Sequence, residues 1–289
     1  MSHERGQSTV EWVGLVFLVA LALAFTGAVA GVAVPGAALA QAISSRIVCA
    51  LELSGPCEPA TDPLVTAYGG KVAALLRERT LPVRYEEGMR LLPVDYRECR
   101  DYACAEGAER IRVSKTEAGL PVSAFAHVVD CRRKPAIPED AECSGDAAGN
   151  LYLQYWFYYP SSATGEGSTP LKPVIREVSG AIGKPSYHPD DWESLQLRIE
   201  PDGQVYARAS AHHAYGIGWL PLEFAGFTVS GGSHAGTVRP ADFARVTPAR
   251  RLTLIPLEPI AASEPGAEFA VTPPWRKRVW LDPEYHGTD

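Results

Sequence analysis

Residues 190–213 read DDWESLQLRIEPDGQVYARASAHH, and this stretch decides how the second half of the chain folds. Successive side chains of a strand point to opposite faces. Five residues at every second position therefore share one face: Asp191, Glu193, Leu195, Leu197 and Ile199. The turn Glu200-Pro201-Asp202-Gly203 follows, in which Gly203 can take the left-handed position of a three-residue loop. The stretch predicts an antiparallel hairpin.

The register of this hairpin follows from its apolar residues. If residues 201–203 form the loop, Glu200 faces Gln204, and the next apolar pairs are Ile199 with Val205, Leu197 with Ala207 and Leu195 with Ala209. Continued further, the same register sets Glu193 opposite Ala211 and Asp191 opposite His213. A slip by one residue would turn Tyr206, Arg208 and Ser210 toward the core, which disfavours that alternative.

Four polar side chains converge on one end of the predicted hairpin: His188, Asp191, Glu193 and His213. A carboxylate on an otherwise apolar face needs a cation or several hydrogen-bond donors. Mostly oxygen ligands with one or two imidazoles suit Mg²⁺, Ca²⁺ or Mn²⁺, and Zn²⁺ is an alternative. The competing interpretation is a hydrogen-bonded cluster that closes the end of the fold. His234, in a glycine-rich loop, is a weaker candidate for the same end.

The sequence identifies no reaction. The stretch Gly231-Gly232-Ser233-His234-Ala235 approximates a nucleophile elbow, but it lacks the closing glycine and a strand-to-helix context. Asp191 and Glu193 share one strand face, which suits a single cation better than the separated acid and base of a glycosidase. Whether the chain is an enzyme stays open.

The composition favours a mainly β fold with α segments. The 289 residues include 26 Gly and 24 Pro, a density of turn-forming residues typical of loop-rich β architectures. Residues 152–159, YLQYWFYY, predict a central strand that is buried on both faces. Thr61-Asp62-Pro63 predicts the start of a helix that runs to Thr80. The net charge of −7 argues against a nucleic-acid partner.

Six cysteines occur, all between Cys49 and Cys143. An even number in an exported segment indicates three disulfides, with 15 conceivable pairings. The spacing favours three short-range pairs: Cys49 with Cys57, Cys99 with Cys104, and Cys131 with Cys143. Zinc is the alternative, but no C-x-x-C pair is present.

The N-terminal segment predicts a membrane helix. No Asp, Glu, Lys or Arg occurs from Trp12 to Ser45, and about 20 apolar helical residues span a bilayer core of about 30 Å. Gly27 and Gly31 lie four apart, a spacing of small residues that lets such helices associate closely. Ala38-Leu39-Ala40 before Gln41 offers a competing signal-peptidase site.

The flank of this helix, Arg5-Gly6-Gln7-Ser8-Thr9-Val10-Glu11-Trp12, resembles the leaders of Flp-type pilins and TadE-like pseudopilins. The resemblance implies cleavage after Gly6 by a prepilin peptidase, with Gln7 as the new first residue and Glu11 at the fifth position. A carboxylate at the edge of a bilayer is costly unless it is paired. In this family its partner is the terminal amine of a neighbouring subunit.

Five motifs follow one another in the C-terminal half: YWFYYP at 155–160, HPDDWE at 188–193, SAHH at 210–213, GSHA at 232–235 and WLDP at 280–283. In kind and order they resemble the motifs of the Vps62-like family and, more distantly, those of the NPP1-type necrosis-inducing proteins. The resemblance implies a β-sandwich that binds a divalent cation through His188, Asp191 and Glu193. The chain departs from the necrosis proteins at Ser161-Ser162, where they have an Asp, and at Asp190, where they have a second His.

Together these features predict a leader at 1–6, a membrane helix at 7–45, a linker and amphipathic helix at 46–81, and an exoplasmic, disulfide-bearing β-sandwich at 82–289. The leading hypothesis is a single-pass, pilin-like exported protein that displays a cation- or ligand-binding domain outside the cell membrane. The alternatives are a metal-assisted hydrolase or lytic effector that acts on envelope lipid or glycan, and a structural pseudopilin.

Overall fold

The computed structural model describes residues 62–107, 110–162, 188–211, 214–215, 218–224, 226–239 and 245–287, all within one compact unit, Asp62–Asp289. The predicted leader and the predicted membrane helix lie outside the described residues. No helix in the described ranges combines the length and apolar character needed to cross a bilayer.

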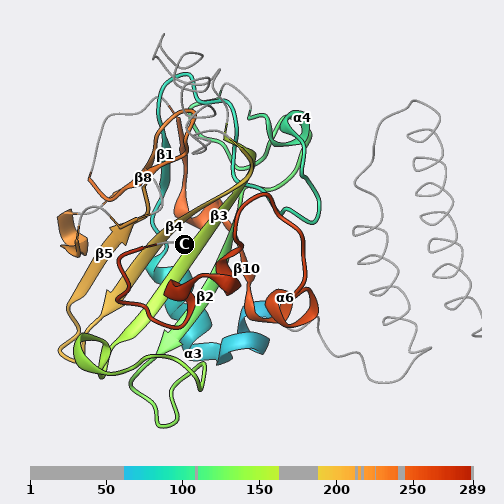
Figure 1. The fold of residues 1–289 in the computed structure, drawn as a ribbon. Coiled ribbons are helices and arrows are strands. Elements are labelled where there is room, and N and C mark those ends of the chain that lie inside the picture. Colours follow the sequence, from blue (N-terminus) through green and yellow to red (C-terminus); the bar gives the residue numbers. More distant parts are fainter. Residues whose placement is uncertain are drawn as a thin grey trace, which may run out of the picture. The chain divides into compact units, whose positions relative to one another are not determined.

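The described residues form a mainly β fold with two sheets (Figure 1). The larger sheet has the order β10 (Thr253–Pro256), β2 (Ser123–Asp130), β3 (Leu151–Ser161), β4 (Pro189–Ile199), β5 (Val205–Ala209) and β6 (Leu220–Pro221). The smaller sheet has the order β8 (Gly236–Thr237), β7 (Phe227–Val229), β1 (Val83–Tyr85) and β9 (Arg245–Thr247). Both sheets are mixed, because β10 runs parallel to β2 and β1 runs parallel to β7.

The predicted hairpin is present with the predicted register. In β4 and β5, Leu195 pairs with Ala209, Leu197 with Ala207 and Ile199 with Val205. Gly203 has φ 88°, the left-handed conformation that the loop requires. The aromatic stretch is also confirmed as a central strand, since β3 lies between β2 and β4 and is buried along nearly its whole length.

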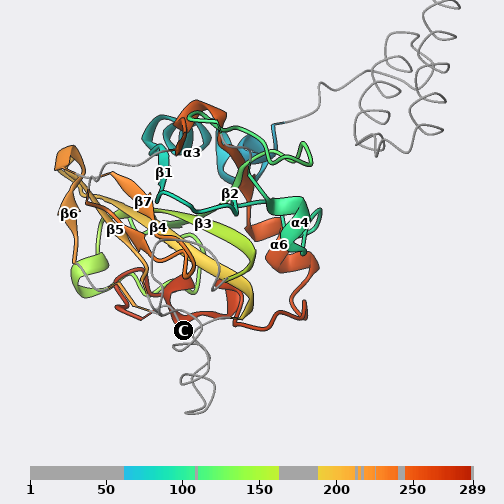
Figure 2. The same ribbon diagram turned by 90° about the horizontal axis from the view of Figure 1, so that it is seen from above.

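Different segments cover the two faces of the larger sheet, and adjacent residues of β3 show this. The Tyr155 hydroxyl donates to the Leu76 carbonyl in helix α3 (Pro63–Arg79), 2.8 Å away. The Gln154 amide donates to the Val279 carbonyl in η5 (Arg278–Trp280), 3.0 Å away on the other face. Figure 2 shows α3 on one side of the sheet and the C-terminal segment on the other.

Helix α3 begins as predicted. The Asp62 side chain caps it by accepting from the Leu64 amide, and Pro63 occupies the first turn. Gly69, at φ 77°, kinks the helix. The other helical segments are short: α4 (Tyr102–Ala105), α6 (Glu258–Ser263), η1 (Gly145–Ala147), η2 (Leu222–Phe224), η3 (Ala249–Arg251) and η4 (Pro274–Arg276).

The smaller sheet packs on the same face as α3. The Phe157 ring of β3 stacks on the Phe227 ring of β7, with centroids 4.8 Å apart. Gly236 donates its amide to the Ser210 carbonyl at the end of β5, 2.7 Å away. A side chain at Gly236 would lie 3.0 Å from that carbonyl and from the Phe227 ring, so the close approach of the two sheets requires glycine here.

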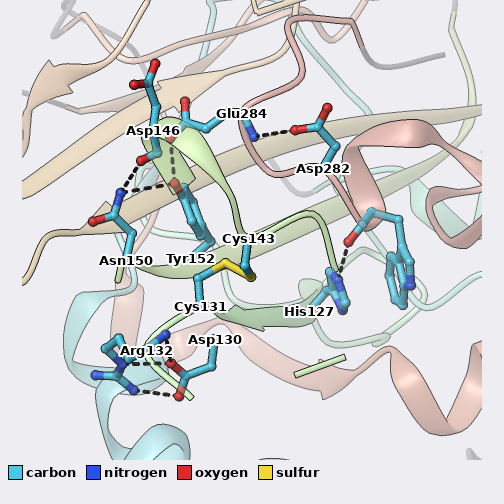
Figure 3. Close-up of a disulfide and its surroundings, with 11 residues drawn as sticks. His127, Asp130, Cys131, Arg132, Cys143, Asp146, Asn150, Tyr152, Asp282 and Glu284 are labelled. Atoms are coloured by element: carbon cyan, nitrogen blue, oxygen red, sulfur yellow. Dashed lines mark hydrogen bonds and ion pairs between the residues drawn. A yellow bond between two sulfur atoms is a disulfide. The ribbon is translucent and has the colours of Figure 1, made fainter. Parts of the chain in front are cut away.

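Two of the three predicted disulfides fall on described residues, and both are confirmed. Cys99 bonds to Cys104 and Cys131 bonds to Cys143, five and twelve positions apart. Figure 3 shows the second bridge beside Tyr152, whose hydroxyl donates to Glu284 at 2.6 Å. The two bridges lie near opposite ends of the larger sheet, since Cys131 directly follows β2 whereas the Cys99 loop reaches the start of β4.

The third predicted disulfide is not tested. Cys49 and Cys57 both lie outside the described residues, which begin at Asp62. The described residues therefore hold two disulfides where the sequence predicts three for the whole chain. The bond between Cys49 and Cys57 stays a prediction from their short spacing.

Candidate functional site

The start of β4 carries two buried carboxylates on one face. Asp191 pairs across the sheet with Tyr159, and Glu193 pairs with Phe157. Asp191 is 6% exposed and Glu193 is 7% exposed. The predicted alternation of β4 therefore holds at both positions, and both carboxylates continue the face that carries Leu195.

His234 contacts the first of these carboxylates. Its Nδ1 lies 2.8 Å from Asp191 Oδ2, and its ring stacks on Tyr159 with centroids 4.0 Å apart. The residue is fully buried and has φ 53°, which is uncommon for a residue with a side chain. The sequence ranked His234 as the weaker candidate because a histidine in a glycine-rich loop is usually exposed. The structure brings it to the site through the turn between β7 and β8.

Ser210 contacts the second carboxylate. Its hydroxyl donates to Glu193 Oε2 at 2.5 Å and accepts from the Ser194 amide at 2.7 Å. Its carbonyl accepts from Gly236, so Ser210 also links the site to the smaller sheet. Burial, and then the charge of Asp191, raise the pKa of Glu193 well above its usual range, against the opposing effects of Ser210 and the Lys277 charge.

The predicted pairing of Asp191 with His213 is not tested. The β4–β5 ladder ends at Leu195 and Ala209, and beyond it Ala211 pairs with Ala214. His213 lies outside the described residues. His188 directly precedes β4, is half-buried, and has its ring Nδ1 3.0 Å from the Pro189 carbonyl oxygen.

Asp190 points to the opposite face of β4 and belongs to a separate network. Its carboxylate accepts from the Tyr158 hydroxyl at 2.6 Å, from Arg100 Nη2 at 2.8 and 2.9 Å, and from the Ala270 amide at 2.9 Å. Sequence reasoning missed these contacts because Arg100 and Ala270 are about 80 to 90 positions away from Asp190.

A second carboxylate–imidazole pair lies further along the sheet. His127 of β2 is fully buried, with Nδ1 2.5 Å from Glu258 Oε1. Its Nε2 lies 2.9 Å from the Trp280 carbonyl, and Figure 3 shows this second contact. Its ring stacks on Trp280 at 3.4 Å. Glu258 also contacts the Tyr68 hydroxyl. Sequence reasoning missed this pair too, because Glu258 is 131 positions away from His127.

The protons of this second pair can be assigned from geometry. The Trp280 carbonyl can only accept, so Nε2 of His127 carries a proton. Burial lowers the pKa of His127 to about 3 and raises the pKa of Glu258 to about 8. Near neutral pH the neutral ring therefore accepts at Nδ1 from a protonated Glu258, although 34% of that side chain remains exposed.

The arrangement of the described side chains bears on metal binding and on nucleophilic catalysis by serine. Among the residues that the structure describes, no group of three or more His, Cys, Asp or Glu side chains is arranged to hold a metal ion.

Ser233 lies in the turn between β7 and β8, where its hydroxyl is 3.4 Å from Ser230 and 3.5 Å from the Ala235 amide. This turn joins two strands, so it is not a nucleophile elbow between a strand and a helix.

The chain matches no known protein family and no curated protein. Among solved structures it is similar to "NLPPya in complex with mannosamine", with 12% identity and a TM-score of 0.43 over 80% of this chain and 94% of the other. It is also similar to "NLPPya in complex with glucosamine", with 12% identity and a TM-score of 0.38 over 78% of this chain and 91% of the other. A third similar structure is "Toxin fold as basis for microbial attack and plant defense", with 14% identity and a TM-score of 0.30 over 75% of this chain and 98% of the other.

One of these titles names a toxin fold, and the sequence resemblance to necrosis-inducing proteins stays a prediction. None of them supports the pilin-like interpretation of the N-terminus. Their TM-scores are too low to carry a ligand or an activity over to this chain.

Proposed function

We propose that this chain is an exported binding protein whose β domain holds a divalent cation at Asp191 and Glu193. One observation carries the proposal: two carboxylates share a buried strand face, where one imidazole and one hydroxyl contact them and the Lys277 charge acts on Glu193. Buried like charges are unfavourable unless one takes up a proton or a cation neutralises both. A divalent cation offsets both charges at once.

The donor set favours Mg²⁺ or Mn²⁺ among the candidate ions. Mg²⁺ is commonly held by one or two carboxylates together with several waters, which suits a pair of carboxylates without a third protein ligand. Ca²⁺ takes six to eight oxygen ligands, and structural Zn²⁺ takes four protein ligands. His234 then serves as an outer partner that orients Asp191 by donating from Nδ1.

Export is the second part of the proposal. Disulfides persist in oxidising compartments, and the described residues contain two. Anchoring by a pilin-like helix, cleavage by a prepilin peptidase and self-association rest on residues 1–45 of the sequence. Terminal sequencing of the mature protein tests the anchor: Gln7 as the first residue supports it, whereas Gln41 would indicate a secreted protein.

Thermal unfolding in EDTA and in millimolar Mg²⁺, Mn²⁺ or Ca²⁺ tests the cation site. A ligand that binds only the folded state at 100 times its Kd stabilises by about 2.7 kcal/mol. Mg²⁺ should therefore raise the melting temperature of the wild type but not of Asp191→Asn or Glu193→Gln. Asp130→Asn is the matched control, because Asp130 is equally buried but is paired with Arg132 at the other end of the sheet. An unresponsive wild type, or a full response in Asp191→Asn, contradicts the proposal.

A further inference from the structure

Asp190 and His234 are the two non-glycine residues with positive φ in the described part of the chain, at 56° and 53°. One directly precedes Asp191 and the other contacts its carboxylate. Such a conformation costs roughly 1–3 kcal/mol and persists only where surrounding contacts enforce it. The backbone on both sides of the Asp191 contact is therefore held in place by its neighbours.

At Asp190 the enforcing contacts are identifiable. Its buried carboxylate accepts hydrogen bonds from Tyr158 in β3, from the Ala270 amide and from Arg100. Arg100 Nη2 also donates to the Glu268 carbonyl at 2.9 Å, and its guanidinium lies 4.8 Å from the Phe269 ring. Arg100 thus joins the start of β4 to the segment around residue 269.

Arg100 is itself held by a closed loop. It follows Cys99, which is 2% exposed and bonded to Cys104 across a Cα separation of 5.9 Å. The backbone before the loop is tied to β3, because the Val94 amide donates to the Tyr158 carbonyl at 3.0 Å. The disulfide therefore restricts where the Arg100 side chain begins, and Arg100 restricts Asp190.

We propose that the Cys99–Cys104 loop positions Asp191 through the Arg100–Asp190 ion pair, and thereby sets the affinity of the cation site. Arg100 and Asp190 are positioning residues, since Asp190 points to the face of β4 opposite Asp191. Without Arg100, Asp190 loses the charge that pairs with its buried carboxylate, and the left-handed backbone relaxes toward an extended one. That change rotates the peptide before Asp191 and moves its carboxylate away from Glu193. The consequence for affinity rests on the function proposed above.

The test compares the two described disulfides in the full-length protein. Cys99→Ser with Cys104→Ser should weaken Mg²⁺ binding by titration calorimetry roughly tenfold, the usual effect of losing an outer partner of a metal ligand. Cys131→Ser with Cys143→Ser removes the bridge at the other end of the sheet and should leave the Kd unchanged. Arg100→Ala should weaken binding as the first pair does, and Arg100→Lys should restore part of it.

A second readout separates this proposal from the cation site itself. The His234 ring contacts Asp191, so its NMR resonances should move in Arg100→Ala even without a cation, whereas those of His127 should stay in place. If the wild type binds no cation but His234 shifts, the positioning role stands and the proposed function fails. Unchanged His234 resonances together with an unchanged Kd in both Arg100→Ala and the Cys99/Cys104 variant would overturn the proposal.

Discussion

The described residues contain two pairs of a carboxyl group and a buried imidazole, and the two pairs differ in what surrounds them. In each, the Nδ1 of a fully buried histidine contacts a carboxylate and the ring stacks on an aromatic side chain, Trp280 beside His127 and Tyr159 beside His234. In the His127 pair, Nε2 of His127 donates to the Trp280 carbonyl, and the protonated Glu258 donates to Nδ1 of His127. Beside the His234 pair lies a second buried carboxylate, Glu193, whose pKa is raised partly by the Asp191 charge.

This difference separates a structural pair from a candidate site. A buried polar group with complete hydrogen bonding contributes to stability and has no need of a ligand. Two close carboxylates favour the binding of a proton or a cation, so the stability of the folded state at this place depends on the pH and on the cation concentration. Each of the following substitutions alters one pair at a time.

The largest effect is expected at the structural pair. His127→Ala removes the stacked ring and leaves the Glu258 carboxyl and the Trp280 carbonyl without their partner, which should lower the free energy of unfolding by about 3 kcal/mol. Urea unfolding measures the loss. His286→Ala, at an exposed histidine, should change it by less than about 0.5 kcal/mol. A loss below about 1 kcal/mol at His127 would mean that the pair adds little to stability.

Glutamine substitutions test the charge state of the glutamate at each of the two places. Without cations, Glu193 near pH 7 either is charged beside Asp191 or has taken up a proton at a free-energy cost. Glu193→Gln removes both costs and should raise the free energy of unfolding by about 1 kcal/mol. Glu258→Gln keeps a neutral donor toward His127 and should preserve the wild-type stability or raise it. Both variants are measured by urea unfolding in EDTA. A clear loss in Glu258→Gln would show that Glu258 and His127 form an ion pair instead of a neutral pair.

The smallest expected effect is a change in how the free energy of unfolding varies with pH. The folded pKa of Glu258, about 8, lies above its ordinary value of 4.5, so its contribution is complete below pH 4.5 and is lost as the pH rises toward 8. His127 has a folded pKa of about 3, below its ordinary 6.5, so its contribution is complete above pH 6.5 and is lost as the pH falls toward 3. In EDTA, Glu258→Gln should therefore flatten the decline of the free energy of unfolding between pH 4.5 and 8. An unchanged slope would contradict the assignment of a neutral Glu258.

Local sequence patterns were sufficient to predict the hairpin and the carboxylates. Alternation along β4 places Asp191 and Glu193 on one face, and Gly203 sets the loop that fixes the register. The two short disulfides in the described residues follow from loop length in the same way. The partners that define the site did not follow, because His234 and Arg100 reach β4 from 43 and 90 positions away. Such contacts depend on how the sheets and loops pack, which no periodicity in the chain encodes.

The NMR spectrum of the histidine rings during a Mg²⁺ titration at neutral pH tests the central claim most directly. The chain has seven histidines, and single His→Gln variants assign the rings of His127 and His234. The account predicts that the His234 resonances shift with Mg²⁺ and return with EDTA, because the ring contacts a carboxylate that binds the cation, while the His127 resonances do not move. Resonances of His234 that stay unmoved up to millimolar Mg²⁺ would contradict it.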